Sequence, residues 1–144
     1  MNDKTHTLNE LIEITRDGET FYRHALSEVK SPELRQVFEE MAQVKSGVIQ
    51  ALAVKVAAND EHPAQGGTLF GKIREAYADA RAGVTSDKDA AYVAQLEATE
   101  DRILEAYEDA LKDADTDVQA LLGIELPKIR ACHARMSQLK KRLA

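Results

Sequence analysis

The stretch "EVKSPELRQVF", residues 28–38, decides the fold because it holds a turn and the start of a helix. Ser31 is a good N-cap, Pro32 suits the first helical position, and Glu33 suits the positive end of the helix dipole. Since the turn is very short, the helices on either side, expected at residues 8–29 and 32–57, should pack as an antiparallel hairpin.

The first of these helices carries an apolar stripe with one charged member. Thr7 and Glu10 form a capping box that sets the expected start of the helix. Glu19 lies at the centre of the stripe, beside Gly18. The stripe recurs at alternating spacings of three and four residues, as one face of a helix does, and consists of Leu8, Ile12, Thr15, Glu19, Tyr22, Leu26 and Val29. A carboxylate on a buried face must protonate, pair or bind a cation.

The second half of the chain repeats this arrangement. A helix expected at residues 87–112 begins after a capping Ser86 and has Glu100 at the centre of its stripe. A last helix, expected at residues 116–142, ends in the basic stretch "KKRLA", which suits a helix C-terminus. Pro127 lies inside it and predicts a kink. Glu19 of the first hairpin thus corresponds to Glu100 of the second.

A loop at residues 59–67 and a shorter amphipathic helix at residues 69–83 separate the two hairpins, and the helix could act as a crossover. Two similar hairpins joined by a long connection are the ferritin-like way of building a four-helix bundle. We therefore expect one all-α domain over residues 1–144, an up-down-down-up bundle with an additional crossover helix.

The composition narrows the class of protein. The 144 residues are 44% apolar and 31% charged, with no Trp, so the core must be largely aliphatic. The net charge is −6, and acidic and basic side chains alternate along the chain instead of forming blocks, which argues against a nucleic-acid-binding surface. A single cysteine, Cys132, excludes an internal disulfide framework. With neither an apolar signal region nor a run long enough to span a membrane, the expected location is the cytoplasm.

The polar residues on the buried stripes allow two interpretations. In the first, they bind metal. The candidate ligands are Glu19, Glu100, Glu125 and His133. Ferritin-like dinuclear centres use a Glu from each of two helices and a Glu-x-x-His pair from each of the other two. The single glutamates are present here, but the Glu-x-x-His pairs are not.

In the second interpretation the same residues form a buried polar network that fixes helix register. Counting from the turns places Lys45 near the level of Glu19, and a lysine supplies a positive charge where a metal needs a donor. Glu97 lies one turn before Glu100 and could reach His133. The incomplete ligand set favours this network, with Lys45 and Glu97 as polar-core partners, over a metal centre.

Other chemical groups favour structural roles. Tyr22 and Tyr107 lie on the stripes beside the glutamates and could hydrogen-bond them. Cys132 lies on a buried face, where it should be an unreactive small hydrophobe. No nucleophile–base constellation or phosphate loop is present, so we predict no catalytic residues and no organic cofactor site.

Four stretches resemble one known family in order and spacing. They are "LIEITRDGETFYRHA", "SPELRQVFEEMA", "LEATEDRILEAYEDAL" and "DVQALLGIELPKIRACHARM". The chain is similar to bacterial ferritin-like four-helix-bundle proteins catalogued as a domain of unknown function, distant kin of rubrerythrin and bacterioferritin. The most specific matching positions are Asp17-Gly18-Glu19, Glu97, Glu100-Asp101, Tyr107 and His133. The resemblance implies the fold and a small cytosolic protein but no established activity, and Lys45 departs from an iron centre.

From these observations we expect a non-enzymatic, stress-associated or structural bundle that forms a homo-oligomer, in the simplest case a dimer, and binds neither nucleic acid nor membrane. The stress association comes from ferritin-like kinship. The alternative is a protein that binds iron, manganese or zinc at Glu19 and Glu100, with help from Glu125 or His133. A third hypothesis is partner binding through an exposed patch on the crossover helix at residues 69–83.

Overall fold

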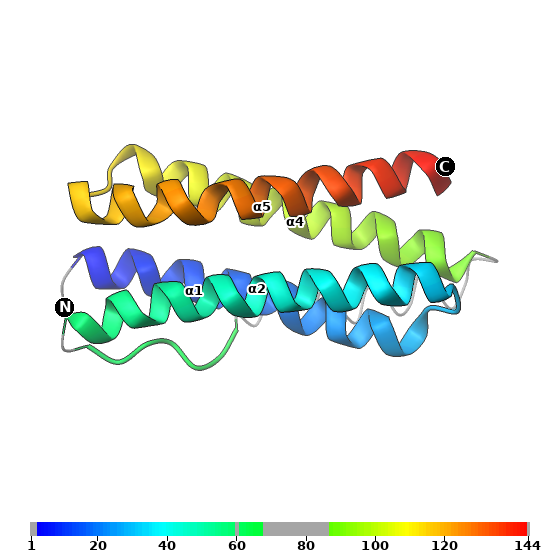
Figure 1. The fold of residues 1–144 in the computed structure, drawn as a ribbon, viewed down its shortest axis with the longest axis horizontal. Coiled ribbons are helices and arrows are strands. Elements are labelled where there is room, and N and C mark those ends of the chain that lie inside the picture. The colour runs from blue at the N-terminus through cyan, green and yellow to red at the C-terminus, as the bar shows by residue number, and fades with distance from the viewer. Residues whose placement is uncertain (1–2, 60, 68–86, 144) are drawn as a thin grey trace.

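The computed structural model describes residues 3–59, 61–67 and 87–143. This part of the chain contains no strand and forms four helices: α1 (Asp3–Glu28), α2 (Pro32–Ala58), α4 (Lys88–Lys112) and α5 (Thr116–Leu143). Figure 1 shows two antiparallel hairpins side by side, α1 with α2 and α4 with α5, in which α1 and α5 run one way and α2 and α4 the other. The crossover helix expected at residues 69–83 lies outside the described residues.

Side-chain caps set the starts of α2 and α4. The Ser31 hydroxyl accepts a hydrogen bond from the Leu34 amide at 3.3 Å, as the sequence predicts for the start of α2. In α4 the N-cap is Asp87, whose carboxylate accepts from the Ala90 amide at 2.9 Å. The helix therefore begins one residue later than a cap at Ser86 would place it.

The start of α1 differs from the expectation. The helix begins at Asp3, before the predicted start at residue 8, so Thr7 lies inside the helix instead of capping it. The additional turn is held by an ion pair of 2.7 Å from the Lys4 ammonium to Asp117 in the first turn of α5. Thr5 in this turn is buried. A local capping signal was thus overridden by a contact between distant parts of the chain.

The core consists of two apolar clusters on either side of a polar layer. The cluster at the α1–α2 turn is rich in aromatic residues, including Phe21, Phe38 and Tyr92. The cluster at the other end is mainly aliphatic. Lys45 and Glu100 lie between the two clusters and are both fully buried. None of the described helices combines the length and the apolar character that crossing a membrane requires.

Gly18 packs against the polar layer, beside the Lys45 side chain. A Cβ atom at this buried position would lie 2.8 Å from Ile103 Cδ1 and 3.5 Å from Lys45 Cε. The missing side chain therefore makes room for the lysine stem. At the other irregular position, α5 continues as a helix through Pro127.

Candidate functional site

A buried ion pair lies at the centre of the bundle. Lys45 of α2 and Glu100 of α4 place Nζ 2.6 Å from Oε1, and both side chains are completely buried. The second carboxylate oxygen, Oε2, accepts a hydrogen bond of 2.5 Å from the Tyr22 hydroxyl of α1. Three helices thus contribute one group each, and both oxygens of Glu100 are engaged.

The electrostatics of this centre favour a closed network. Burial, and then the negative charge of Glu100, raise the pKa of Tyr22 well above its usual value, so the hydroxyl remains a hydrogen-bond donor at neutral pH. An ammonium group at 2.6 Å neutralises Glu100 and occupies the space that a metal ion would need.

Two neighbouring groups are also held in their neutral forms. The Tyr107 hydroxyl lies 2.6 Å from Thr15 Oγ1, which in turn donates to the Leu11 carbonyl. Burial raises the pKa of Tyr107 despite the hydrogen bond to Thr15. Burial also raises the pKa of the Cys132 thiol, although the nearby Lys45 ammonium acts in the opposite direction. A protonated, buried thiol is a poor nucleophile.

The structure does not bring the four predicted metal ligands together. They occupy four separate ion pairs: Glu19 with Arg23, Glu100 with Lys45, Glu125 with Lys128, and His133 with Asp101. Glu19 is the largest departure from the expectation, because its side chain is 16% exposed and lies 3.2 Å from Arg23 on the next turn. Gly18 takes the inward position that the stripe assigned to Glu19.

A second polar cluster lies on the side of the bundle, between α4 and α5. Glu97 and Asp101, one helical turn apart on α4, meet His133 of α5, and one donor atom of each lies within 4.8 Å of the others. His133 Nε2 contacts Asp101 Oδ1 directly. Glu97 accepts a hydrogen bond of 3.2 Å from the Ser137 hydroxyl and lies 3.5 Å from the Lys140 ammonium.

The sequence pattern anticipated only part of this cluster. The stripe pattern predicts that Glu97 can reach His133, whereas Asp101 enters only through the family resemblance. The signal that could have found it is the i, i+4 spacing of two carboxylates on α4, opposite a histidine on α5. Within the described residues, this is the group of three or more donors able to surround an ion.

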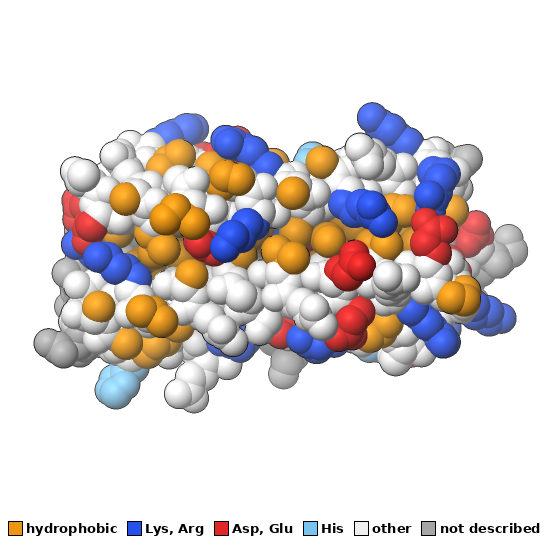
Figure 2. Space-filling model, viewed as in Figure 1, with side chains coloured by type: hydrophobic (Ala, Val, Ile, Leu, Met, Phe, Trp, Pro, Cys, Tyr) orange, Lys and Arg blue, Asp and Glu red, His pale blue; other side chains and the backbone are white. Residues whose placement is uncertain are grey.

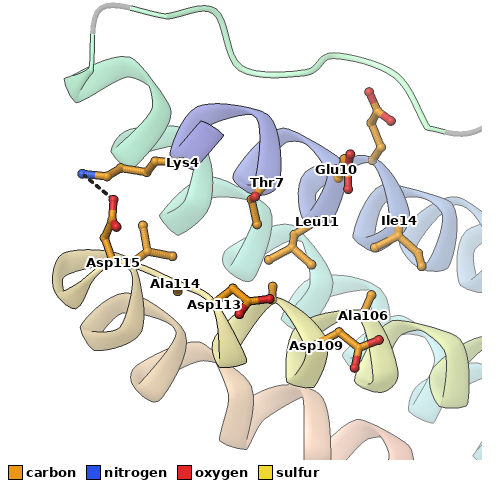
Figure 3. Close-up of a pocket in the computed structure, with 13 residues that line it drawn as sticks. Lys4, Thr7, Glu10, Leu11, Ile14, Ala106, Asp109, Asp113, Ala114 and Asp115 are labelled. Carbon is orange, nitrogen blue, oxygen red and sulfur yellow. Dashed lines mark ion pairs between the residues drawn. The ribbon is translucent and has the colours of Figure 1, made fainter. Parts of the chain in front are cut away.

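The groove between α1 and α4 has a volume of about 660 Å³ and an acidic rim (Figure 3). In the view, Leu11 lies between Glu10 of α1 on one side and Asp109 of α4 and Asp113, the C-cap residue of α4, on the other. Lys4 lies at one end, where it pairs with Asp115 at 3.9 Å. The ionisable side chains that line this groove are carboxylates and the paired Lys4.

A second groove, of about 510 Å³, lies between α2 and α5. Figure 2, which looks onto these two helices, shows hydrophobic side chains gathered along the seam between them. Glu40 and Arg135 flank the seam. We call this surface the α2–α5 groove; it is lined by Glu40, Met41, Val44, Gly47, Val48, Lys128, Ala131, Cys132 and Arg135.

The chain was compared with models of protein families, with curated proteins and with solved structures. The model of the family described as Domain of unknown function (DUF2383) matches residues 3–113. This range includes Lys45 and Glu100 but not His133. No curated protein and no solved structure matches the chain.

Proposed function

Because the chain belongs to the family described as Domain of unknown function (DUF2383), we infer its role from its own geometry. We propose that it is a non-enzymatic, ferritin-like bundle that acts by associating with other protein chains. A stress-associated role is part of the proposal and rests on ferritin-like kinship alone, which is an analogy at the level of fold. The observation that carries the non-enzymatic assignment is the buried pair of Lys45 and Glu100, 2.6 Å apart.

This pair supports a structural role for the bundle centre. A catalytic metal centre needs anionic or neutral donors and an open coordination position. Both oxygens of Glu100 are already used, one by a cation and one by the Tyr22 hydroxyl. A metal ion could bind Glu100 only after displacing Lys45, which would leave an unpaired ammonium in the core.

Metal content separates this proposal from a central metal site that uses Glu19 and Glu100. Protein purified from cells supplemented with iron, manganese and zinc should have the same metal content whether it is wild type or carries Glu100→Gln. Glu105→Gln, on an exposed position of α4, is the matched control. Stoichiometric metal that disappears only with Glu100→Gln would overturn the structural assignment.

The α2–α5 groove supports self-association as the mode of action. Two large hydrophobic side chains are exposed on these helices, Val54 of α2 at 70% and Ile124 of α5 at 63%. On α5, Ile124 precedes the groove residues Lys128 and Ala131 by four and seven positions, so it lies on the same ridge. Apolar surface of this kind, rimmed by charges, is typical of interaction sites.

The charges along the groove favour a second copy of the chain as the occupant. Glu33 pairs with Arg142 at one end of the two helices and Lys55 pairs with Asp117 at the other, so residues between them share levels. Glu40 of α2 and Arg135 of α5 accordingly lie at one level across the groove. A two-fold axis parallel to the helices would place α2 of one copy over α5 of its partner, acid against base.

The state of association tests this part of the proposal. Sedimentation velocity of the wild type should show a dimer, and Ala131→Glu, at an exposed position in the groove, should convert it to a monomer. Ala134→Glu, exposed on the same helix but outside the groove, should leave the dimer intact. A monomeric wild type, or equal effects of the two variants, would contradict self-association through this surface.

A further inference from the structure

The lateral cluster of Glu97, Asp101 and His133 is built from donors that suit a transition-metal ion. It joins two carboxylates and one imidazole from two helices, and one donor atom of each already lies within 4.8 Å of the others. Glu97 and His133 are half-buried and Asp101 is exposed, so the side chains are anchored on one side and open to water on the other. It is separate from the central pair of the bundle.

We propose that Glu97, Asp101 and His133 form a binding site for one zinc ion between α4 and α5. Zinc binds imidazole nitrogen and carboxylate oxygen at about 2.0–2.2 Å, which requires donors about 4 Å apart or closer. His133 Nε2 and Asp101 Oδ1 are already in direct contact, so these two side chains would part around the ion while the Glu97 carboxylate closes on it. Three protein donors leave the fourth tetrahedral position for water.

The charges around the cluster are suited to a dication. Two carboxylates balance the two positive charges of zinc, and neutral histidine is the ligand form of the imidazole. The Ser137 hydroxyl, 3.2 Å from Glu97 Oε2, orients that carboxylate as an outer-shell partner does in known metal sites. The ammonium group of Lys140 lies 3.5 Å from Glu97 Oε1 and would repel the zinc ion. This flexible side chain therefore has to move aside when the ion binds.

A zinc site at this position gives a role to the contact between His133 and Asp101, which is not part of the central network. His133 and Asp101 form a hydrogen-bonded pair on the surface of the helices and have no part in the network around Lys45 and Glu100. In the metal-bound form Nε2 of His133 would turn from the Asp101 oxygen to the ion, with Asp101 bound to the same ion. Such an exchange changes only side-chain torsions and leaves the helix backbones in place.

Calorimetric titration of untagged full-length protein with zinc chloride tests the site. We expect one zinc per chain for the wild type, and affinity reduced at least about 10-fold by His133→Ala or Asp101→Asn, since even outer-shell losses reach this size. His62→Ala, which removes an exposed loop histidine, is the matched control and should bind as the wild type does. Circular dichroism should show unchanged helicity for all three variants.

Lys140→Gln gives a test in the opposite direction. Removing this ammonium should tighten zinc binding by about 3-fold, the size expected for a unit charge near the surface. Lys141→Gln, its exposed neighbour, should change the affinity less. The proposal is overturned if the wild type does not bind zinc, or if His133→Ala binds it as tightly as the wild type.

Discussion

The central ion pair leads to a quantitative prediction about folding stability. Lys45→Met keeps an unbranched stem but leaves Glu100 buried with the Tyr22 hydroxyl as its remaining partner in the network. Removing one partner of a buried pair costs about 3–5 kcal/mol, because the other charge is left uncompensated. Glu100→Gln should cost a similar amount, since it leaves the Lys45 ammonium beside a neutral amide.

The double variant should lose about 2–3 kcal/mol less than the sum of the two single effects. With both charges removed, no uncompensated ion is left in the core, and the Tyr22 hydroxyl can still donate to the new amide carbonyl. We expect a coupling free energy of about 2–3 kcal/mol between Lys45 and Glu100. Urea unfolding followed by circular dichroism measures the free energies of all four proteins of the cycle.

The pair of Glu19 and Arg23 provides the control. The two side chains lie 3.2 Å apart on neighbouring turns of α1, and Arg23 is 47% exposed, so their coupling should be only about 0.3–0.5 kcal/mol and should weaken in salt. Coupling between Lys45 and Glu100 should persist in about 1 M salt, although the screening length there falls to about 3 Å, because a fully buried pair is screened much less than an exposed one. Additive effects of Lys45→Met and Glu100→Gln would refute the reasoning.

Three further predictions follow from individual contacts. Gly18→Ala should destabilise the fold by about 1–3 kcal/mol in urea unfolding, because its Cβ would lie 2.8 Å from a packed methyl group, whereas Gly47→Ala, with open space, should stabilise it by about 0.5–1 kcal/mol. The ammonium groups of Lys4 and Lys55 hold the pKa of Asp117 well below its usual range. The stability that the ionised Asp117 gives to the fold is therefore present above about pH 4 and is lost as the pH falls further. In thermal unfolding, the melting temperature of the wild type should therefore fall more on acidification than that of Asp117→Asn. Burial raises the pKa of Tyr22, so its stabilisation is complete below about pH 10 and declines above it as the unfolded chain ionises; the stability gap to Tyr22→Phe should narrow there.

Each of these predictions has a clear contrary result. Equal signs for the two glycine variants would show that the close contact at Gly18 carries no energetic weight. An acid transition unchanged by Asp117→Asn would remove the role assigned to its ion pairs. A gap between wild type and Tyr22→Phe that is constant from about pH 8 to about pH 11 would contradict the raised pKa.

The helices could be predicted from sequence because their signals are local. Ser31 and Pro32 mark the start of α2, and apolar spacing marks the buried faces. Counting from the two turns also placed Lys45 at the level of the central carboxylates, since a hairpin fixes the register of its helices. What local signals could not show was the additional turn at the start of α1, because Lys4 is held there by Asp117, far along the chain.

The direction of each polar side chain was harder to predict. Positions 18 and 19 differ by 100° around the helix, and a broad apolar stripe accommodates either one. The choice depends on packing, because the Lys45 stem needs the space that Gly18 leaves and Glu19 is thereby turned towards Arg23. The grouping of Asp101 with His133 likewise depends on how α4 packs against α5.

Anomalous diffraction at the zinc edge, from crystals grown with excess zinc, tests the central claim most directly. The claim is that Lys45, and not a metal ion, neutralises Glu100 at the centre of the bundle. We predict lysine density within hydrogen-bonding distance of Glu100 and no anomalous peak beside that carboxylate. A peak coordinated by Glu100, with the Lys45 side chain turned away, would contradict it.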